Sequence, residues 1–249
     1  MERLRYAWRT VSFVAVFIVM LGIMFVAQLG VMTFFVIFRP TGSRKLMLHK
    51  AMWRVCRWLL HHIPGVGVDI INRSGEDFSR PAIIVANHQS HLDLLCLLAL
   101  TPRVVFMAKR WVWRNPLYGI IIRYADFIPS DESFDRNVER MANLAACGYS
   151  TVIFPEGTRS ATLRMGRFHR GAFHAAARLG MDVVPVALHG TGRVMNKHTF
   201  AITPGRITIE ILPRITVGAE ADADVRSLAR EAREAIERCY NEIERDTAL

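Results

Sequence analysis

The 249 residues are enough for one large domain or two small ones, and a hydrophobic content of 51% excludes a chain too polar to bury a core. The formal net charge of +10 and the sequence pI near 10.1 indicate an anionic partner, which could be nucleic acid, a phospholipid surface or a phosphorylated substrate. The mean hydropathy of +0.20 is high for a soluble protein.

The first predicted element is a membrane segment over residues 11–38. No charged residue occurs in this stretch, and at about 1.5 Å per residue a helix of this length exceeds the roughly 30 Å hydrocarbon core of a bilayer. A cleaved signal peptide and a buried core helix are the alternatives, but both are usually shorter. Basic residues are more numerous after the segment than before it, which predicts a cytoplasmic main domain. A helix pair that dips into one leaflet would show the same charges.

Residues 45–62 form a second helical stretch, in which Leu, Met and Trp side chains recur at helical spacing among Lys and Arg. Such a helix fits the surface of a bilayer, and it fits packing against its own domain equally well. We therefore assign residues 1–63 to membrane-anchoring N-terminal helices and residues 64–249 to the main domain.

The main domain has the pattern of an α/β fold with a mostly parallel sheet flanked by helices. After Pro64-Gly65, short apolar runs alternate with helical patterns. Gly148 and Gly180 follow two of the helical patterns as C-cap glycines. The predicted strands are 82–86, 104–108, 151–154 and 183–188, and the predicted helices are 90–100, 136–147, 168–179 and 224–245.

Reactive side chains follow three of the predicted strands. The first strand runs into Asn-His-Gln-Ser-His-Leu-Asp at 87–93, the second into Lys109, and the third into Pro-Glu-Gly-Thr-Arg at 155–159. In open parallel sheets, ligands bind beyond the carboxyl ends of the strands. We therefore expect these three segments to converge on one cleft.

Three interpretations of the segment from Asn87 to Asp93 are open. His88, His91 and Asp93 could ligate a metal, but a further ligand would have to come from elsewhere and no H-E-x-x-H pattern exists. Ser90 and Asp93 resemble a helix capping box, although this leaves His88 unexplained. With His88 in the turn and Asp93 in the first helical turn, the carboxylate could instead orient the imidazole as a general base for a substrate hydroxyl.

Residues 154–160 read Phe-Pro-Glu-Gly-Thr-Arg-Ser and end a β-rich run. Arg159 is suited to grip a phosphate through bidentate hydrogen bonds, and Glu156 could orient a substrate hydroxyl or hold the loop. A turn with a solvated Glu-Arg pair is the alternative. The chain contains no G-x-x-x-x-G-K-[ST] loop and no G-x-S-x-G elbow, so neither a nucleotide hydrolase nor a serine esterase is supported.

Together, these two segments resemble the first and third motifs of the glycerolipid acyltransferases, most closely those of the bacterial 1-acylglycerol-3-phosphate acyltransferases. The H-x-x-x-x-D motif of the family corresponds to His88 and Asp93, and its glutamate-glycine motif to Glu156 and Gly157 with Arg159. Val-Val-Pro-Val-Ala-Leu-His-Gly at 183–190 is similar to the proline-containing fourth motif. The resemblance covers roughly residues 64–215 and implies the α/β fold of that family.

The second motif of the family is matched more loosely. Ala108-Lys109 and residues 115–119 look similar to it, but many relatives carry an arginine after an apolar pair where this chain has Phe127-Ile128 followed by Pro129-Ser130. This departure leaves the choice of acceptor open. Arg170 lies in a stretch similar to a lysine-bearing family segment and could supply charge, with packing or surface exposure as alternatives.

The resemblance implies transfer of an acyl group from acyl-coenzyme A or acyl carrier protein to the free hydroxyl of a lysophospholipid, without a metal or a bound cofactor. The product would be phosphatidic acid, and His88, oriented by Asp93, would deprotonate the hydroxyl. The resemblance also implies a protein of the inner membrane whose catalytic domain contacts anionic lipid on the cytoplasmic face. The residues implied in acceptor binding are Lys109, Glu156, Gly157, Thr158 and Arg159.

Two further interpretations stay open. The acceptor could be a lyso-ornithine lipid, another lysophospholipid or glycerol 3-phosphate. Alternatively, the chain could be a non-catalytic membrane module that binds anionic lipid or nucleic acid through its basic surface, although the resemblance implies no nucleic-acid partner.

Overall fold

The computed structural model describes residues 42–115, 119–160, 162–197, 201–217 and 224–247, with isolated positions before residue 41. The described strands are β1 (Val66–Ile71), β2 (Ile83–Ala86), β3 (Val104–Ala108), β4 (Ile128–Pro129), β5 (Ser150–Ile153), β6 (Val183–His189) and β7 (Gly205–Ile211). The described helices are α2 (Gly42–His61), α3 (Leu92–Leu98), the 3₁₀ helix η1 (Arg110–Arg114), α4 (Gly119–Tyr124), α5 (Phe134–Ala146), α6 (Gly171–Leu179), α7 (Thr191–Val194) and α8 (Val225–Thr247).

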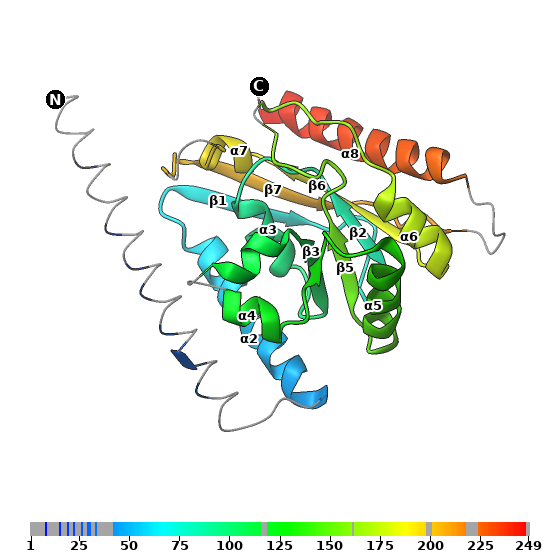
Figure 1. Ribbon diagram of the computed structural model, residues 1–249. Coiled ribbons are helices and arrows are strands. Elements are labelled where there is room, and N and C mark those ends of the chain that lie inside the picture. Colours follow the sequence, from blue (N-terminus) through cyan, green and yellow to red (C-terminus); the bar gives the residue numbers. More distant parts are fainter. Residues whose placement is uncertain are drawn as a thin grey trace.

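The described strands form one seven-stranded sheet in the order β1-β7-β6-β2-β5-β3-β4 (Figure 1). Neighbouring strands pair in parallel, except that β6 and β7 are antiparallel. The prediction of an α/β fold with a mostly parallel sheet flanked by helices is therefore confirmed.

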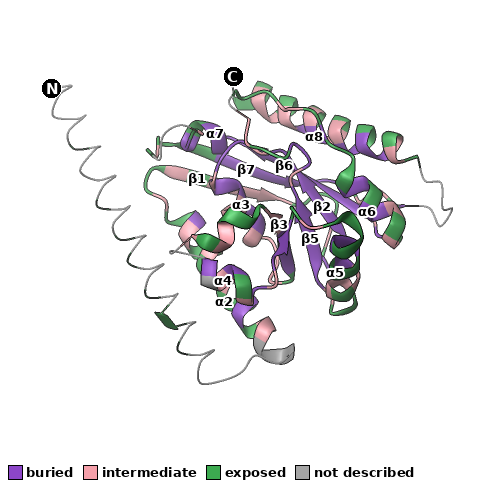
Figure 2. Ribbon diagram, viewed as in Figure 1, coloured by how far each residue is buried: buried purple, intermediate pink, exposed green. Residues whose placement is uncertain are grey.

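The central strands are buried over their whole length. Every residue of β2, β5 and β6 is buried, because α5, α6 and α8 lie on one side of the sheet and α2, α3 and α4 on the other (Figure 1 and Figure 2). Strands covered on both faces are continuous apolar runs rather than alternating patterns. For this reason the four predicted strands agree with the observed β2, β3, β5 and β6 to within one residue at each end.

The predicted helices correspond to α3, α5, α6 and α8. Helix α5 begins two residues earlier than expected, because the Ser133 hydroxyl caps it and accepts a hydrogen bond from the Arg136 N–H at 3.4 Å. Gly148 and Gly180 have φ of +82° and +59°, as expected of glycines that end helices. The C-terminal tail packs back on the domain as predicted, since α8 buries Leu228, Ala229, Ala232, Ile236 and Cys239.

Helix α2 packs against the domain with one side and leaves apolar side chains exposed on another. The indole N–H of Trp53 donates to the carbonyl of Ala99, just after α3, at 3.0 Å. One side of α2 therefore packs against its own domain, and another side has the exposed apolar residues expected of a helix at a bilayer surface. The buried residues of α2 are Leu48, His49 and Leu60, and its exposed large apolar residues are Met47, Val55 and Trp58.

The predicted membrane segment, residues 11–38, lies outside the described residues apart from isolated positions. Within the part of the chain that the structure describes, no helix is both long and apolar enough to cross a bilayer. The proposed division after residue 63 falls between α2 and β1, and α2 packs against both β1 and α3.

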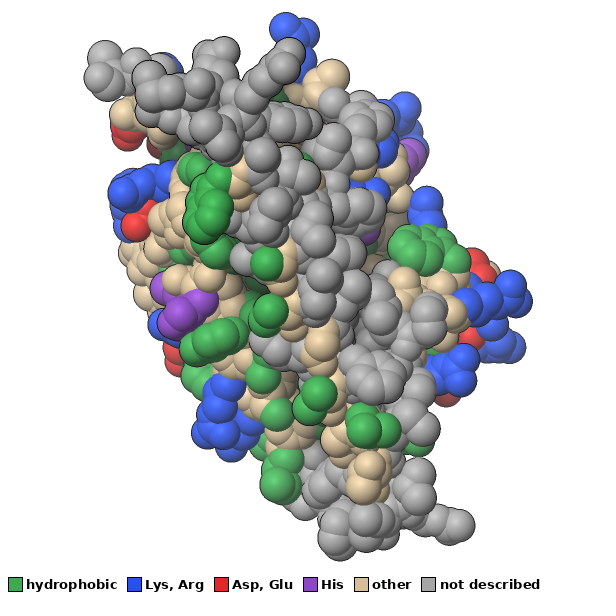
Figure 3. Space-filling model, turned by 90° about the vertical axis from the view of Figure 1, so that its left-hand side faces the viewer, with side chains coloured by type: hydrophobic (Ala, Val, Ile, Leu, Met, Phe, Trp, Pro, Cys, Tyr) green, Lys and Arg blue, Asp and Glu red, His purple; other side chains and the backbone are tan. Residues whose placement is uncertain are grey.

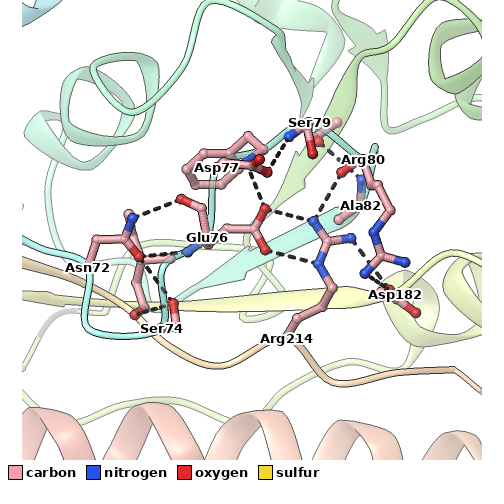
Figure 4. A network of polar contacts seen from close by, with 12 residues as sticks. Asn72, Ser74, Glu76, Asp77, Ser79, Arg80, Ala82, Asp182 and Arg214 are labelled. Atoms are coloured by element: carbon pink, nitrogen blue, oxygen red, sulfur yellow. Dashed lines mark hydrogen bonds and ion pairs between the residues drawn. The ribbon is translucent and has the colours of Figure 1, made fainter.

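An ion-pair network ties the loop after β1 to the amino ends of two central strands (Figure 4). Arg214 donates to both carboxylate oxygens of Glu76, at 2.9 and 2.7 Å, and to the carbonyl of Arg80 at 3.0 Å. Arg80 lies shortly before β2, and Asp182 lies directly before β6. Asp182 accepts a hydrogen bond from Arg214 at 3.5 Å. The hollow of about 400 Å³ beside this network therefore lies at the opposite end of the sheet from the predicted cleft.

Candidate active site

His88 lies in the turn after β2 and Asp93 in the first turn of α3, which is the bent arrangement required by the proton-transfer interpretation. The Nδ1 atom of His88 lies 2.8 Å from Oδ2 of Asp93. Asp93 is completely buried, whereas 14% of the His88 side chain is exposed. A carboxylate on Nδ1 fixes the imidazole tautomer in which Nε2 can accept a proton. The pair therefore has the geometry of a general base.

Asp93 also holds the turn itself. Its Oδ2 accepts hydrogen bonds from the backbone N–H groups of Gln89 at 2.7 Å and Ser90 at 2.8 Å. The Ser90 hydroxyl accepts from the N–H of Leu92 at 3.2 Å and donates to the carbonyl of Met195 at 2.7 Å. The predicted capping box forms in part: Asp93 accepts the Ser90 N–H, whereas the Ser90 hydroxyl accepts the N–H of Leu92 and the N-cap position is His91. Holding the turn and orienting the imidazole are compatible, because the same carboxylate oxygen contacts both.

Asn87 joins the start of this turn to β6. Its side-chain amide donates to the carbonyl of Leu188 and accepts from the Leu188 N–H, both at 2.8 Å. The buried amide thus takes the place of a backbone pair and continues the β2–β6 pairing beyond Ala86. The segment similar to the fourth motif forms β6, and Pro185 lies within this strand opposite Val85.

Glu156 connects the turn at His88 to the loop that follows β5. Its Oε1 accepts the N–H of His88 at 2.8 Å, and its Oε2 accepts the N–H of Gly166 at 2.7 Å. Burial raises the pKa of Glu156, and the two backbone hydrogen bonds oppose this rise. Because backbone groups contact both oxygens, the geometry favours holding the loop over orienting a substrate hydroxyl.

Gly157, Thr158 and Arg159 follow Glu156 in the same turn. Gly157 has a φ of +68°, a region that favours glycine, and Thr158 is exposed. The Nη1 atom of Arg159 is buried and has no hydrogen-bond partner among the described residues. Such a cationic donor is costly to leave unpaired, so an anionic ligand would stabilise it. The amine of Lys197 donates to the Arg159 carbonyl at 2.8 Å and places a second cation nearby.

Lys109 is exposed at the carboxyl end of β3, where it precedes η1. Because β5 lies between β2 and β3, Lys109 lies one strand further from His88 than Glu156 does. The three predicted segments thus follow the carboxyl ends of three neighbouring strands, β2, β5 and β3. At the departure from the second motif, the Ser130 N–H donates to the Ala108 carbonyl at 2.8 Å, and Asp131 pairs with Arg110 at 2.8 Å.

His91 lies close to the charged groups of this site. Burial lowers the pKa of His91, and the nearby Arg159 guanidinium and His88 imidazole lower it further, whereas the Asp93 carboxylate acts in the opposite direction. Among the described residues, no three or more His, Cys, Asp or Glu side chains are grouped so that they could hold a metal ion. His91 therefore lies beside the His–Asp pair.

Four contacts of the site involve residues whose roles were not predicted from the sequence. The phenyl ring of Phe154 stacks on the His88 imidazole, and Lys197 contacts Arg159. The Gln89 amide donates to the Leu163 carbonyl at 2.9 Å and to the hydroxyl of Tyr240 on α8 at 3.2 Å. The position of Phe154 in its motif was a usable signal, but no local pattern links residues as far apart as Gln89 and Tyr240.

Comparison with known proteins agrees with the motif resemblance. The profile of the family described as Acyltransferase matches residues 66–189. The chain is 35% identical over 161 residues to a chloroplastic 1-acyl-sn-glycerol-3-phosphate acyltransferase of Arabidopsis thaliana, a match that covers 63% of this chain and 44% of that protein. It is 31% identical over 205 residues to 1-acyl-sn-glycerol-3-phosphate acyltransferase alpha of Bos taurus, which covers 78% of this chain and 70% of that protein.

The fold also has a counterpart among solved structures. The crystal structure of the 1-acyl-sn-glycerophosphate acyltransferase PlsC from Thermotoga maritima matches 97% of this chain and 98% of its own, with a TM-score of 0.70 at 21% identity. The chain spans about half the length of the plant and algal relatives that it matches. The bovine match extends well beyond the two motifs around His88 and Glu156 and over most of both proteins. The chain therefore belongs to the acyltransferase family.

Proposed function

We propose that this chain transfers an acyl group from an acyl thioester to the free hydroxyl of 1-acylglycerol 3-phosphate and so forms phosphatidic acid. The observation that carries this proposal is the contact between the buried Asp93 carboxylate and Nδ1 of His88. The buried, unpartnered Nη1 of Arg159 supports a phosphate-bearing acceptor, and the backbone N–H of the next residue, Ser160, donates to the His88 carbonyl at 2.8 Å. The names of the relatives add support for this acceptor.

In the proposed reaction, Nε2 of His88 removes the proton of the acceptor hydroxyl while the hydroxyl oxygen attacks the thioester carbonyl. The carbon–sulfur bond then breaks, the new ester forms, and His88 returns the proton to the leaving thiolate. Asp93 stabilises the imidazolium between these steps. General-base assistance of this kind contributes about 10² to 10⁴ in rate. The acyl donor is acyl-coenzyme A or acylated acyl carrier protein, and either one enters as a substrate.

The acceptor phosphate is proposed to lie against Arg159, with Lys109 at the neighbouring strand end as a further cation. Gly157 and Thr158 border this position from the same turn. Phosphate binding by an arginine is geometrically specific because the guanidinium offers paired donors, whereas a lysine supplies a point charge. We therefore expect Arg159 to fix the position of the acceptor and Lys109 to contribute attraction.

We also propose that the chain acts at the inner membrane with its catalytic domain on the cytoplasmic face. Residues 11–38 contain no charge, and exposed apolar residues of α2 adjoin the basic residues Arg54 and Arg57. Figure 3 shows hydrophobic side chains beside Lys, Arg and His side chains on one face of the molecule. Near an anionic lipid surface, each Lys or Arg adds about 1 kcal/mol of attraction.

An acceptor panel tests the reaction. The full-length protein in detergent or vesicles is given acyl-coenzyme A, and thiol release is followed with 1-acylglycerol 3-phosphate, lyso-ornithine lipid, another lysophospholipid or glycerol 3-phosphate. We expect the highest kcat/KM with 1-acylglycerol 3-phosphate and the appearance of phosphatidic acid. A higher value for another acceptor would reassign the substrate, and vesicle binding without thiol release from any acceptor would indicate a lipid-binding module instead.

The His88→Ala variant tests the base. We expect kcat to fall by about 10² to 10⁴, because the acceptor hydroxyl loses the group that removes its proton. His174→Ala, which removes an exposed histidine on α6, is the matched control and should retain full activity. Retention of kcat within a few-fold in His88→Ala would show that another group removes the proton.

A further inference from the structure

The imidazole of His88 is covered on one face by Phe154. The two rings stack with centroids 3.9 Å apart and an interplanar angle of 15°. Two residues further along, Glu156 accepts the backbone N–H of the same histidine. The Phe154-Pro155-Glu156 segment therefore contacts His88 at two points, its ring face and its main chain, and these contacts are independent of Asp93.

The stacked ring constrains a motion that the His88–Asp93 hydrogen bond leaves free. The hydrogen bond at Nδ1 restrains the imidazole at one point, and because hydrogen bonds tolerate some deviation from the ring plane, the imidazole can still tilt about its Cβ–Cγ bond. A phenyl ring parallel to the imidazole opposes this rotation, because tilting would bring the two rings into collision or open a gap between them. The direction of Nε2 is thereby set, and small errors in such directions are costly to catalysis.

Phe154 is itself held in place by the core. Its ring lies 6.2 Å from that of Phe106, measured between centroids, and Phe106 lies 5.4 Å from Phe127. Phe106 is 1% exposed and Phe127 is 6% exposed, whereas Phe154 is half-buried. A row of aromatic rings thus runs from the buried core to the imidazole, and Phe154 is the ring that contacts the proposed base.

We propose that Phe154 is a positioning residue for acyl transfer and acts through His88. Its ring fixes the tilt of the imidazole so that Nε2 faces the acceptor hydroxyl. Its π face also attracts the positive charge that the imidazole gains when the hydroxyl proton moves to Nε2. This proposal rests on the proposed function, because the proton transfer belongs to that reaction.

Two substitutions distinguish an effect of the aromatic ring from an effect of side-chain volume. Phe154→Leu keeps an apolar side chain of moderate size but removes the ring, whereas Phe154→Tyr keeps the ring. In Phe154→Leu we expect kcat to fall about tenfold while KM for the acceptor changes less than about twofold, because Phe154 contacts the base and not the proposed phosphate site. Phe154→Tyr should retain kcat within about twofold.

A matched control measures the general cost of losing a buried ring. Phe173 of α6 is fully buried and stacks with Phe168, at a centroid distance of 6.4 Å. Phe173→Leu should lower the midpoint of thermal unfolding at least as much as Phe154→Leu but leave kcat unchanged. Equal losses of kcat in the two variants would show that Phe154 acts through stability alone and would overturn the proposal.

Proton NMR of histidine-labelled protein gives a readout that does not depend on turnover. The His88 ring protons, identified by their loss in His88→Ala, should be shifted upfield by the phenyl ring in the wild type and in Phe154→Tyr. The shift should disappear in Phe154→Leu. Identical His88 signals in the wild type and Phe154→Leu would overturn the proposal. An upfield shift in a wild type that transfers no acyl group to any acceptor would overturn the proposed function and support the stacked geometry.

Discussion

At the residue scale, the most constrained group of the site is the Asp93 carboxylate. A single oxygen, Oδ2, accepts from the imidazole of His88 and from the backbone of Gln89 and Ser90. The imidazole and the turn that carries it are therefore fixed to the same atom. This arrangement couples the shape of the loop to the orientation of the base, and a change at Asp93 affects both.

The Asp93→Asn variant keeps the size of the side chain and removes its charge. We expect kcat to fall by a factor on the order of 10⁴, because a neutral amide does not stabilise the imidazolium and can impose the wrong tautomer on His88. Steady-state kinetics measures this, with thermal unfolding as a check that the turn still forms. Glu139→Gln, at an exposed position of α5, is the control for loss of a carboxylate. If Asp93→Asn retained more than a tenth of kcat, the orienting role of Asp93 would be wrong.

At the scale of elements, α2 has a polar group on its buried side. His49 is 3% exposed, and its ring lies 4.8 Å from that of Tyr149. Burial lowers the pKa of His49 from 6.5 to about 4, although the nearby Asp126 carboxylate acts in the opposite direction. The packing of α2 on the domain therefore requires an uncharged imidazole and is sensitive to acid.

The free energy of unfolding should fall as the pH is lowered from about 6.5 to about 4. In this window the unfolded chain protonates His49 and the folded protein does not, so protons favour the unfolded state. At about 1.4 kcal/mol per pKa unit, the loss is on the order of 3 kcal/mol. Denaturant unfolding over a pH series should show a smaller loss in His49→Gln than in the wild type. The exposed-residue variant His174→Gln should follow the wild type, and an unchanged slope in His49→Gln would contradict the prediction.

Helix α8 shows how an element outside the residues matched by the family profile reaches the site. The profile ends at residue 189, yet Tyr240 of α8 accepts a hydrogen bond from Gln89 in the turn after β2. One turn further on, Glu244 accepts from His189 at the end of β6, and it also pairs with Arg193. These contacts tie the C-terminal helix to the turn after β2 and to the end of β6.

At the scale of the whole molecule, positive charge and exposed apolar residues coincide near the N-terminal part of the chain. Arg54 and Arg57 are exposed on α2, the helix that also exposes Met47, Val55 and Trp58. An anionic bilayer complements both properties, since its headgroups attract the arginines and its interface accommodates tryptophan. The proposed product and the proposed acceptor are also anionic lipids.

The full-length protein should therefore prefer anionic vesicles when anionic and neutral vesicles are offered together. Raising the salt concentration should weaken this preference, because salt screens exposed charges. In the variant Arg54→Ala/Arg57→Ala, the preference should fall about 30-fold, because each arginine contributes about 1 kcal/mol. Arg226→Ala, on exposed α8 surface, is the control and should leave it unchanged. A preference that is insensitive to salt and to both substitutions would show that charge does not direct binding.

The elements and contacts that depend on residues close together in the chain could be predicted from the amino-acid sequence. Strands buried on both faces are continuous apolar runs, so β2, β3, β5 and β6 could be predicted with their ends. The His88–Asp93 pair could be predicted because the two residues are separated by a single turn. By contrast, β4 has two residues, and β1 and β7 lie on the side of the sheet where the antiparallel pairing occurs, so their place was not predicted.

Which distant groups contact the proposed base is seen only in the folded chain. The position of β2 between β5 and β6 brings Phe154 and Glu156 to one side of His88 and Leu188 to Asn87 on the other. These contacts join residues 66 or more positions apart, and no local pattern encodes them. The physical reason is that strand order is set by packing of the whole domain, while hydrophobic periodicity reports only the surroundings of each segment.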